Sequence, residues 1–166
     1  MAEVTEDIKF NDDRLKEAKR YISHYPEGKQ KSAILPIMHL AQDQWGWLSS
    51  GVMDYIASLL TLESIEVYEV ASFYTMFHLQ KTGKYVMEVC HTGPCVLMGA
   101  EDTIEHIENK LGIKVGETSV DGLFSLKTVE CLAACGFAPV IQIKETYYEN
   151  MNVENVDKLM DELAKN

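Results

Sequence analysis

Two close pairs of cysteines constrain this chain more than any other feature of its sequence. The pairs are Cys90-x4-Cys95 and Cys131-x3-Cys135, and they contain all four cysteines of the 166 residues. Each pair forms a short loop next to an alternating apolar run that is typical of a β-strand. A fold that joins the two loops would bring four sulfur atoms to one place. Four thiolates are the usual ligands of an iron–sulfur cluster, so the pattern predicts an electron carrier.

Composition narrows the class of protein and the kind of partner. Hydrophobic residues make up 46% and charged residues 25% of the chain, as in ordinary globular proteins. The net charge of −11 argues against nucleic acid or an anionic membrane as the partner, and favours docking onto a basic face of another protein. No apolar run approaches the roughly 20 residues of a membrane helix, and residues 1–9 resemble neither a signal nor a transit peptide. We therefore expect a reducing cytosol and cysteines that act as ligands.

The hydrophobic spacing changes near Thr82-Gly83, which we expect to be a linker between two domains. Residues 1–82 are predicted to form a helical bundle, and residues 1 to about 12 are expected to be loosely attached. Apolar residues at helical spacing predict four helices, over about 13–25, 34–45, 50–60 and 64–74. Ser64 is expected to cap the fourth helix, with Tyr74 on its inner face.

Residues 83–166 alternate between strand and helix patterns. Strands are expected at 85–90, 124–131 and 139–144, with a possible hairpin partner at Tyr147 and Tyr148. A helix is expected over 96–111, closed by Gly112, and a last helix capped by Asn152. This order is that of a small thioredoxin-like sheet flanked by helices. The predicted fold class is α+β, with an N-terminal helical bundle followed by a thioredoxin-like domain.

Residues around the cysteines suit an anionic cluster. Gly93 permits a close backbone approach because it has no Cβ atom, and Pro94 suits the first turn of the following helix. The positive end of that helix dipole would then favour the extra electron on reduction. Small and apolar residues of the second loop are expected to shield the cluster from water; they are Leu132, Ala133, Ala134, Gly136, Phe137 and Ala138.

Other interpretations of the cysteines remain open. Structural zinc also binds four thiolates, although its loops most often use Cys-x2-Cys. Disulfides, and cysteines that are merely buried, remain alternatives, whereas the Cys-x-x-Cys of a redox dithiol is absent. A Rieske centre needs two histidines, and only His91 lies between the ligands. The sequence has no phosphate-binding glycine loop, so flavin or nicotinamide must be bound elsewhere. Met76 and Phe77 are expected in the core, with a partner interface as the alternative.

Taken together, the motifs resemble the thioredoxin-like [2Fe–2S] ferredoxin family, which includes the E subunit of NADH:quinone oxidoreductase, respiratory complex I. The resemblance runs from about Arg14 to the C-terminus. It is carried by residues 32–42, 45–49 and 67–77, by both cysteine pairs with Met98-Gly-Ala100 and Ala138-Pro139-Val140, and by residues 112–118, 121–122 and 147–149.

The resemblance implies that Cys90, Cys95, Cys131 and Cys135 bind one [2Fe–2S] cluster. The family usually has glycine at the position of Ala133. The resemblance also implies a flavoprotein partner that carries FMN and oxidises NADH, further iron–sulfur subunits, and a place in the peripheral arm at the cytoplasmic face of the membrane. The N-terminal helices would contact the flavoprotein, and the isolated chain would not turn over NADH. A hydrogenase or formate dehydrogenase subunit, and a zinc-stapled interaction module, remain alternatives.

Overall fold

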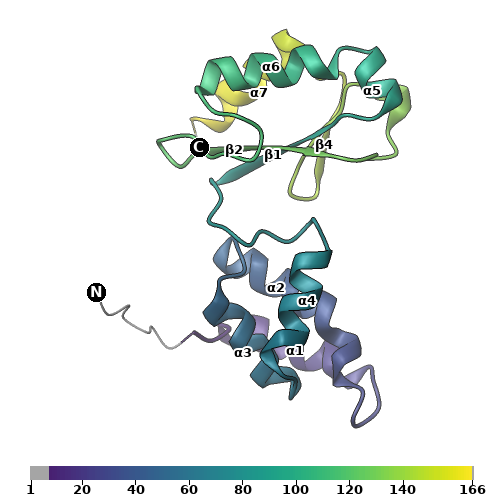
Figure 1. Cartoon of the computed structure of the whole chain (residues 1–166), viewed down its shortest axis with the longest axis vertical. Coiled ribbons are helices and arrows are strands. Elements are labelled where there is room, and N and C mark those ends of the chain that lie inside the picture. Colours follow the sequence, from purple (N-terminus) through teal and green to yellow (C-terminus); the bar gives the residue numbers. More distant parts are fainter. Residues whose placement is uncertain (1–7, 166) are drawn as a thin grey trace. The chain divides into compact units, whose positions relative to one another are not determined.

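The computed structural model describes residues 8–165, which form two compact units that divide after Lys81 (Figure 1). The boundary was expected after Thr82, and the expectation for residues 1–7 lies outside the described residues. The two units are helical and mixed α/β respectively, so the predicted α+β class is confirmed. Within residues 8–165, no helix is long and apolar enough to cross a membrane.

The first unit consists of helices. They are α1 (Asp12–Ser23), the short 3₁₀ helix η1 (Gln30–Ala33), α2 (Ile34–Trp45), α3 (Ser50–Leu60) and α4 (Ser64–Phe73). The side chain of Asn11 accepts the N–H of Arg14 at the start of α1, and Ser49 caps α3 in the same way. Gly46, with φ 81°, ends α2 in the left-handed conformation that glycine adopts readily. All four α-helices predicted for this region are therefore present.

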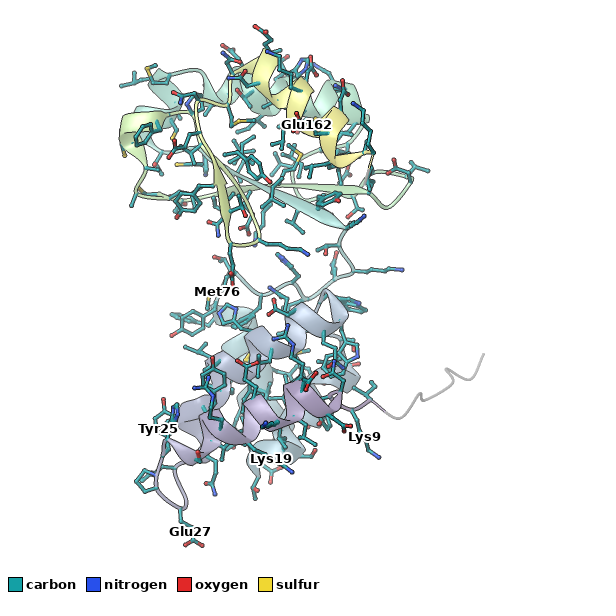
Figure 2. The ribbon with its side chains drawn as sticks, turned by 180° about the vertical axis from the view of Figure 1, so that it is seen from behind. Lys9, Lys19, Tyr25, Glu27, Met76 and Glu162 are labelled. Atoms are coloured by element: carbon teal, nitrogen blue, oxygen red, sulfur yellow. The ribbon has the colours of Figure 1, made fainter. Side chains whose placement is uncertain are left out.

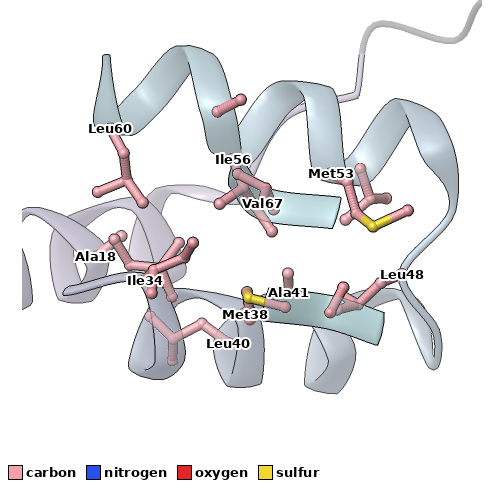
Figure 3. Close-up of a cluster of buried hydrophobic side chains, with 14 of the residues drawn as sticks. Ala18, Ile34, Met38, Leu40, Ala41, Leu48, Met53, Ile56, Leu60 and Val67 are labelled. Carbon is pink, nitrogen blue, oxygen red and sulfur yellow. The ribbon is translucent and has the colours of Figure 1, made fainter. Parts of the chain in front are cut away.

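A single apolar core holds these helices together (Figure 3). Its fully buried side chains include Ile37, Met38, Leu48, Ile56, Leu60 and Val67. Burying a side chain of this size contributes about 1.5–3 kcal/mol. Helices of 10–12 residues are marginal in isolation, so packing stabilises them more than intrinsic propensity does.

Phe10 is more buried than the sequence suggested, whereas Phe77 is buried as expected. Phe10 belongs to the stretch expected to be loosely attached, yet its buried ring stacks on Trp45 with centroids 5.2 Å apart and lies edge-on to Tyr55. A lone aromatic residue among polar neighbours carries no periodic signal, which is why this expectation was wrong. The burial of Phe77 confirms its expected core position over the partner-interface alternative. Met76 is exposed, so its expected core position is wrong (Figure 2).

The fourth helix begins and ends differently from the prediction. Its N-cap is Glu63 and not Ser64, because Glu63 and Glu66 form a reciprocal capping box. Tyr74 lies beyond the helix with an extended backbone and an exposed side chain, so it is not on the inner face. A helical pattern alone does not show where packing stops.

The second unit is a mixed four-stranded sheet with helices. Its elements are β1 (Tyr85–Cys90), α5 (Gly93–Leu97), α6 (Ala100–Leu111), β2 (Phe124–Val129), the 3₁₀ helix η2 (Cys135–Phe137), β3 (Ile141–Ile143), β4 (Thr146–Tyr148) and α7 (Val153–Leu163). The strand order is β2-β1-β3-β4. The β1–β2 pair is parallel, and the β1–β3 and β3–β4 pairs are antiparallel.

Helices α6 and α7 lie against the same face of this sheet, and side chains fill the space between the sheet and the helices (Figures 1 and 2). Alternation along β1 sends Met87 and Val89 into that core, where they meet Ile107 of α6 and Val156 of α7. Glu88 points to the opposite face of the sheet. One face is therefore apolar and covered, as the alternating pattern predicted.

The helix expected over 96–111 is divided in two. Helix α5 ends at Leu97, and α6 starts at Ala100 after Gly99, whose φ of 94° breaks the helical path. The expectation of one helix was therefore wrong, because the left-handed glycine stops the first helix. Two strands are also shorter than predicted, since β2 stops at Val129 before the second cysteine loop and β3 covers only Ile141–Ile143.

Gly83, which was expected to be part of a linker, is fixed against β2. It is buried, and its N–H donates to Ser125 Oγ at 2.7 Å. A Cβ atom added to it would lie only 2.8 Å from the carbonyl carbon of Phe124. Gly83 is therefore an anchored part of the second unit.

Candidate metal centre

The two cysteine loops start side by side at one end of the sheet. Cys90 is the last residue of β1 and pairs with Val129, the last residue of the parallel strand β2. The N–H of His91 donates to the carbonyl oxygen of Val129 at 3.2 Å, which joins the two loops at their first residues. Neighbouring parallel strands end at the same edge, so the fold gives the convergence that the cysteine spacing suggested.

The two pairs differ in burial. Cys90 and Cys95 are each 2% exposed and pack with Ala100 and Ala138, whereas Cys131 and Cys135 are exposed. All four are free thiols. The first pair is therefore held in a small apolar pocket, and the second pair lies on a more open loop.

Hydrogen bonds make the buried pair suitable for negative charge. Burial raises the pKa of Cys90, but hydrogen bonds from the hydroxyl and N–H of Thr92, the N–H of Leu132 and the Cys95 thiol outweigh it and lower the pKa. Burial and donation to Cys90 raise the pKa of Cys95 to about 11, against the opposing effect of the N–H of Val140. These hydrogen bonds thus favour negative charge on Cys90, and Cys95 acts as a hydrogen-bond donor to it.

The second loop reaches both members of the first pair. The N–H of Leu132 lowers the pKa of Cys90. The charge of Cys135 raises the pKa of Cys95, although burial and the hydrogen bond with Cys90 raise it more. Within the second loop, the N–H of Ala133 donates to Cys131 Sγ at 3.2 Å. Backbone N–H groups therefore point at the sulfurs of three of the four cysteines.

These residues fit an iron–sulfur cluster better than a single metal ion. Within residues 8–165, no three His, Cys, Asp or Glu side chains are grouped closely enough to hold one metal ion. A four-thiolate zinc site is therefore not preformed. A binuclear cluster instead takes two thiolates on each iron, which matches two separate pairs, and N–H groups near sulfur suit its negative charge.

Two sequence expectations about the surroundings need correction. Leu132 and Ala138 pack on the first cysteine pair as expected, whereas Ala133, Gly136 and Phe137 are exposed and do not belong to that cluster of buried residues. Pro94 is in the first turn of α5, yet α5 has only five residues, so the dipole of a long helix does not act here. Single backbone N–H groups, such as that of Ala133, stabilise negative charge on the sulfurs instead.

Sequence reasoning expected backbone N–H groups near the sulfurs but did not identify which residues donate. Thr92 contributes both its hydroxyl, with Oγ1 3.5 Å from Cys90 Sγ, and its backbone N–H. A hydroxyl residue two positions after a ligand was a usable signal for this contact. The N–H groups of Leu132 and Val140 carried no such signal, because any residue except proline supplies a backbone donor.

Comparisons with known proteins agree with this site. The family model for thioredoxin-like [2Fe–2S] ferredoxins matches residues 18–164. The NADH-quinone oxidoreductase E subunit of Rickettsia conorii is 44% identical over 155 residues, covering 93% of each chain. An NADH-quinone oxidoreductase E subunit of Rhizobium meliloti is 40% identical over 139 residues, covering 84% of this chain and 82% of its own.

One solved structure has a similar fold. It is an NAD⁺-reducing [NiFe]-hydrogenase in the H₂-reduced state, with a TM-score of 0.71 and 17% identity. The match covers 80% of this chain and 22% of the hydrogenase chain. At this identity the likeness concerns the fold alone.

Proposed function

The chain belongs to the thioredoxin-like [2Fe–2S] ferredoxin family, and from this premise we propose that it is the electron-transfer E subunit of an NADH:quinone oxidoreductase. In this role Cys90, Cys95, Cys131 and Cys135 hold one [2Fe–2S] cluster. When bound, the cluster would supply one-electron chemistry suited to exchange with the FMN of a partner flavoprotein. Relatives of this name that match over nearly their whole length support the assignment.

One observation carries the proposal: both cysteine loops begin at the same end of the sheet. Cys90 ends β1 opposite Val129, the last residue of β2, and the N–H of His91 donates to the Val129 carbonyl oxygen at 3.2 Å. Two loops that begin side by side can supply ligands to one bound group. The chain's own residues stabilise negative charge on sulfur, while Ala100 and Ala138 keep water from the buried pair.

NADH and FMN are assigned to the partner flavoprotein. The sequence offers no glycine-rich phosphate loop for either, which supports an electron carrier without its own NADH turnover. The same role puts the chain in the peripheral arm at the cytoplasmic face of the membrane, beside other iron–sulfur subunits. The expected contact between the N-terminal helices and the flavoprotein belongs to this proposal, and the exposed Ile65 and Phe73 of α4 are candidates for it.

A second apolar surface lies at the cysteine loops. Leu97 and Met98, just after the first loop, are 87% and 63% exposed, and Phe137, just after the second, is 52% exposed. Exposed apolar residues mark a protein contact where they form one continuous patch, and these three flank the two cysteine loops. We assign this docking face to the partner flavoprotein, since an electron donor or acceptor has to come close to the cluster.

The alternatives are separated by simple observations. A subunit of a hydrogenase or formate dehydrogenase would have the same fold, so the identity of the copurifying subunits distinguishes it from complex I. A zinc-stapled module would give a colourless protein with zinc and no sulfide.

The cluster assignment is tested by replacing each cysteine with serine. The native complex, and the chain reconstituted with iron and sulfide, should contain both elements and lose visible absorption on reduction. Each of C90S, C95S, C131S and C135S should lose or alter this spectrum, whereas V120S, at a fully exposed position, should not. An unchanged spectrum and paramagnetic signal in any cysteine variant would remove that residue from the ligand set.

A further inference from the structure

The side chain of Gln42, on α2, holds the backbone that leads out of the first unit. Its amide group donates to the carbonyl oxygen of Met76 at 2.9 Å and accepts the N–H of His78 at 2.7 Å. The carbonyl oxygen of His78 in turn accepts the N–H of Leu48 at 2.8 Å. Three hydrogen bonds therefore fix residues 76–78 to the first unit. We call the two bonds made by the Gln42 amide the Gln42 clamp.

Phe77 adds an apolar anchor between the two clamped residues. Its ring is 5% exposed and packs on His39 of α2, with ring centroids 5.0 Å apart. The ring and the clamp act on adjacent residues, so this segment cannot leave α2 without losing both kinds of contact.

The second unit holds the chain again a few residues later. Gly83 N–H donates to Ser125 Oγ at 2.7 Å, and Lys84 N–H donates to the carbonyl oxygen of Gly122 at 3.1 Å. Residues 79–82, which we call the tether, make no hydrogen bond to any other part of residues 8–165. The free connection between the two units is therefore only four residues long.

The clamp determines how far this connection can reach. Five Cα–Cα steps separate His78 from Gly83, so the tether spans at most about 18 Å. If the chain came free back to Phe73, where α4 ends, ten steps would span up to about 36 Å. Opening the clamp and its neighbouring contacts would thus double the reach of the connection.

Gln44 makes the same pair of hydrogen bonds to a different segment. Its amide donates to the carbonyl oxygen of Lys9 and accepts the N–H of Asn11, both at 3.1 Å. Phe10, between those two residues, is also buried. Both glutamines lie on α2, but only Gln42 holds the residues that precede the tether. Gln44 is therefore a matched comparison.

We propose that Gln42 is a positioning residue, which keeps the tether at four residues and so limits how far the cysteine-bearing unit can move from the helical unit. Its role in electron transfer rests on the proposed function, in which the helical unit docks on the flavoprotein. A short tether then keeps the cluster unit at a high effective concentration beside the docked partner, and a longer one dilutes it.

The Leu48 N–H reports on the clamp without being altered by the substitution. Q42L removes both bonds of the clamp but leaves the carbonyl oxygen of His78 as the acceptor for Leu48. In the full chain, hydrogen exchange of the Leu48 N–H should be at least about fivefold faster in Q42L than in the wild type, the factor for two hydrogen bonds of the weaker kind. Q44L should leave this exchange unchanged, although it removes an equivalent pair of bonds.

Cleavage at Lys81 gives a second measurement. Lys81 is exposed, but a protease binds several residues on each side of the bond that it cuts, so a tether of four residues resists cleavage until one anchor opens. Trypsin should cut after Lys81 faster in Q42L than in Q44L. Equal cleavage rates and equal Leu48 exchange in these two variants would overturn the proposal, because a loss of general stability affects both alike.

The last experiment uses the native complex. Reduction of the cluster by NADH should be slower with Q42L than with Q44L, while the visible spectra of the two variants stay the same. Equal reduction rates would overturn the role of the clamp in electron transfer. A wild-type chain that binds no cluster, or copurifies with no flavoprotein, would instead refute the proposed function, and the exchange and cleavage measurements would still decide whether Gln42 holds the tether.

Discussion

A methyl group added at Gly83 should destabilise the second unit. A Cβ atom there would lie 2.8 Å from the carbonyl carbon of Phe124 and 3.0 Å from the carbonyl carbon and oxygen of Leu123. Carbon atoms pack best at about 3.5–4.0 Å, so the contacts with the two carbonyl carbons are repulsive. The strands cannot separate easily, because Gly83 N–H donates to Ser125 Oγ at 2.7 Å and Tyr85 N–H to the Leu123 carbonyl at 2.9 Å.

The size of the effect follows from two opposing contributions. Overpacking against rigid backbone typically costs about 1–3 kcal/mol. Replacing glycine by alanine also restricts the unfolded chain, which returns about 0.4–1 kcal/mol. The difference is about 0–2.6 kcal/mol, so we expect G83A to lower the free energy of unfolding by about 1.3 kcal/mol. For a unit of this size, each kcal/mol lowers the unfolding temperature by about 4–8 °C.

Two spectroscopic signals follow the units separately. Both tryptophans, Trp45 and Trp47, belong to the first unit, so their fluorescence reports its unfolding, while far-ultraviolet circular dichroism reports both units. G83A should shift the dichroism transition of the second unit and leave the fluorescence transition unchanged. The matched control is G136A, because a Cβ atom at Gly136 meets nothing within 4 Å. Equal unfolding temperatures for G83A and G136A would refute the packing argument.

The remaining predictions concern pH and partner binding. Burial raises the pKa of Glu88 above its ordinary value of 4.5, so folding favours its protonated form, and the contribution of Glu88 to stability should fall as pH rises from 4.5 through the raised pKa. In urea titrations from about pH 4 to pH 7, E88Q should lack this loss, and parallel curves for the two proteins would contradict the assignment. The double variant L97S/F137S should reduce copurification of the flavoprotein without changing the visible spectrum. The control variant V120S should copurify with the flavoprotein normally. Full copurification of the double variant would exclude this docking face.

Local pattern was sufficient for most of the fold. Helical spacing from residue 13 to Phe73 and alternation along β1 depend only on neighbours within a few residues. The order of helices and strands could therefore be predicted from the sequence. The ends of helices and the contacts between distant residues were harder to predict. Gly99 adopts a left-handed conformation that separates α5 from α6. The ring of Phe10 packs against Trp45 and Tyr55, which are more than 30 positions away along the chain. Such contacts between distant residues leave no trace in a local pattern.

The sequence by itself determined the ingredients of the site: four thiols in two short loops, each beside a strand, within an acidic chain. Only the tertiary structure decided that the first pair is buried and the second exposed, and which peptide N–H faces which sulfur. The physical reason is that a ligand's identity is a property of its side chain. Its charge state and orientation depend on backbone donors, and every residue except proline carries one, so only folding selects those of Leu132 and Ala133.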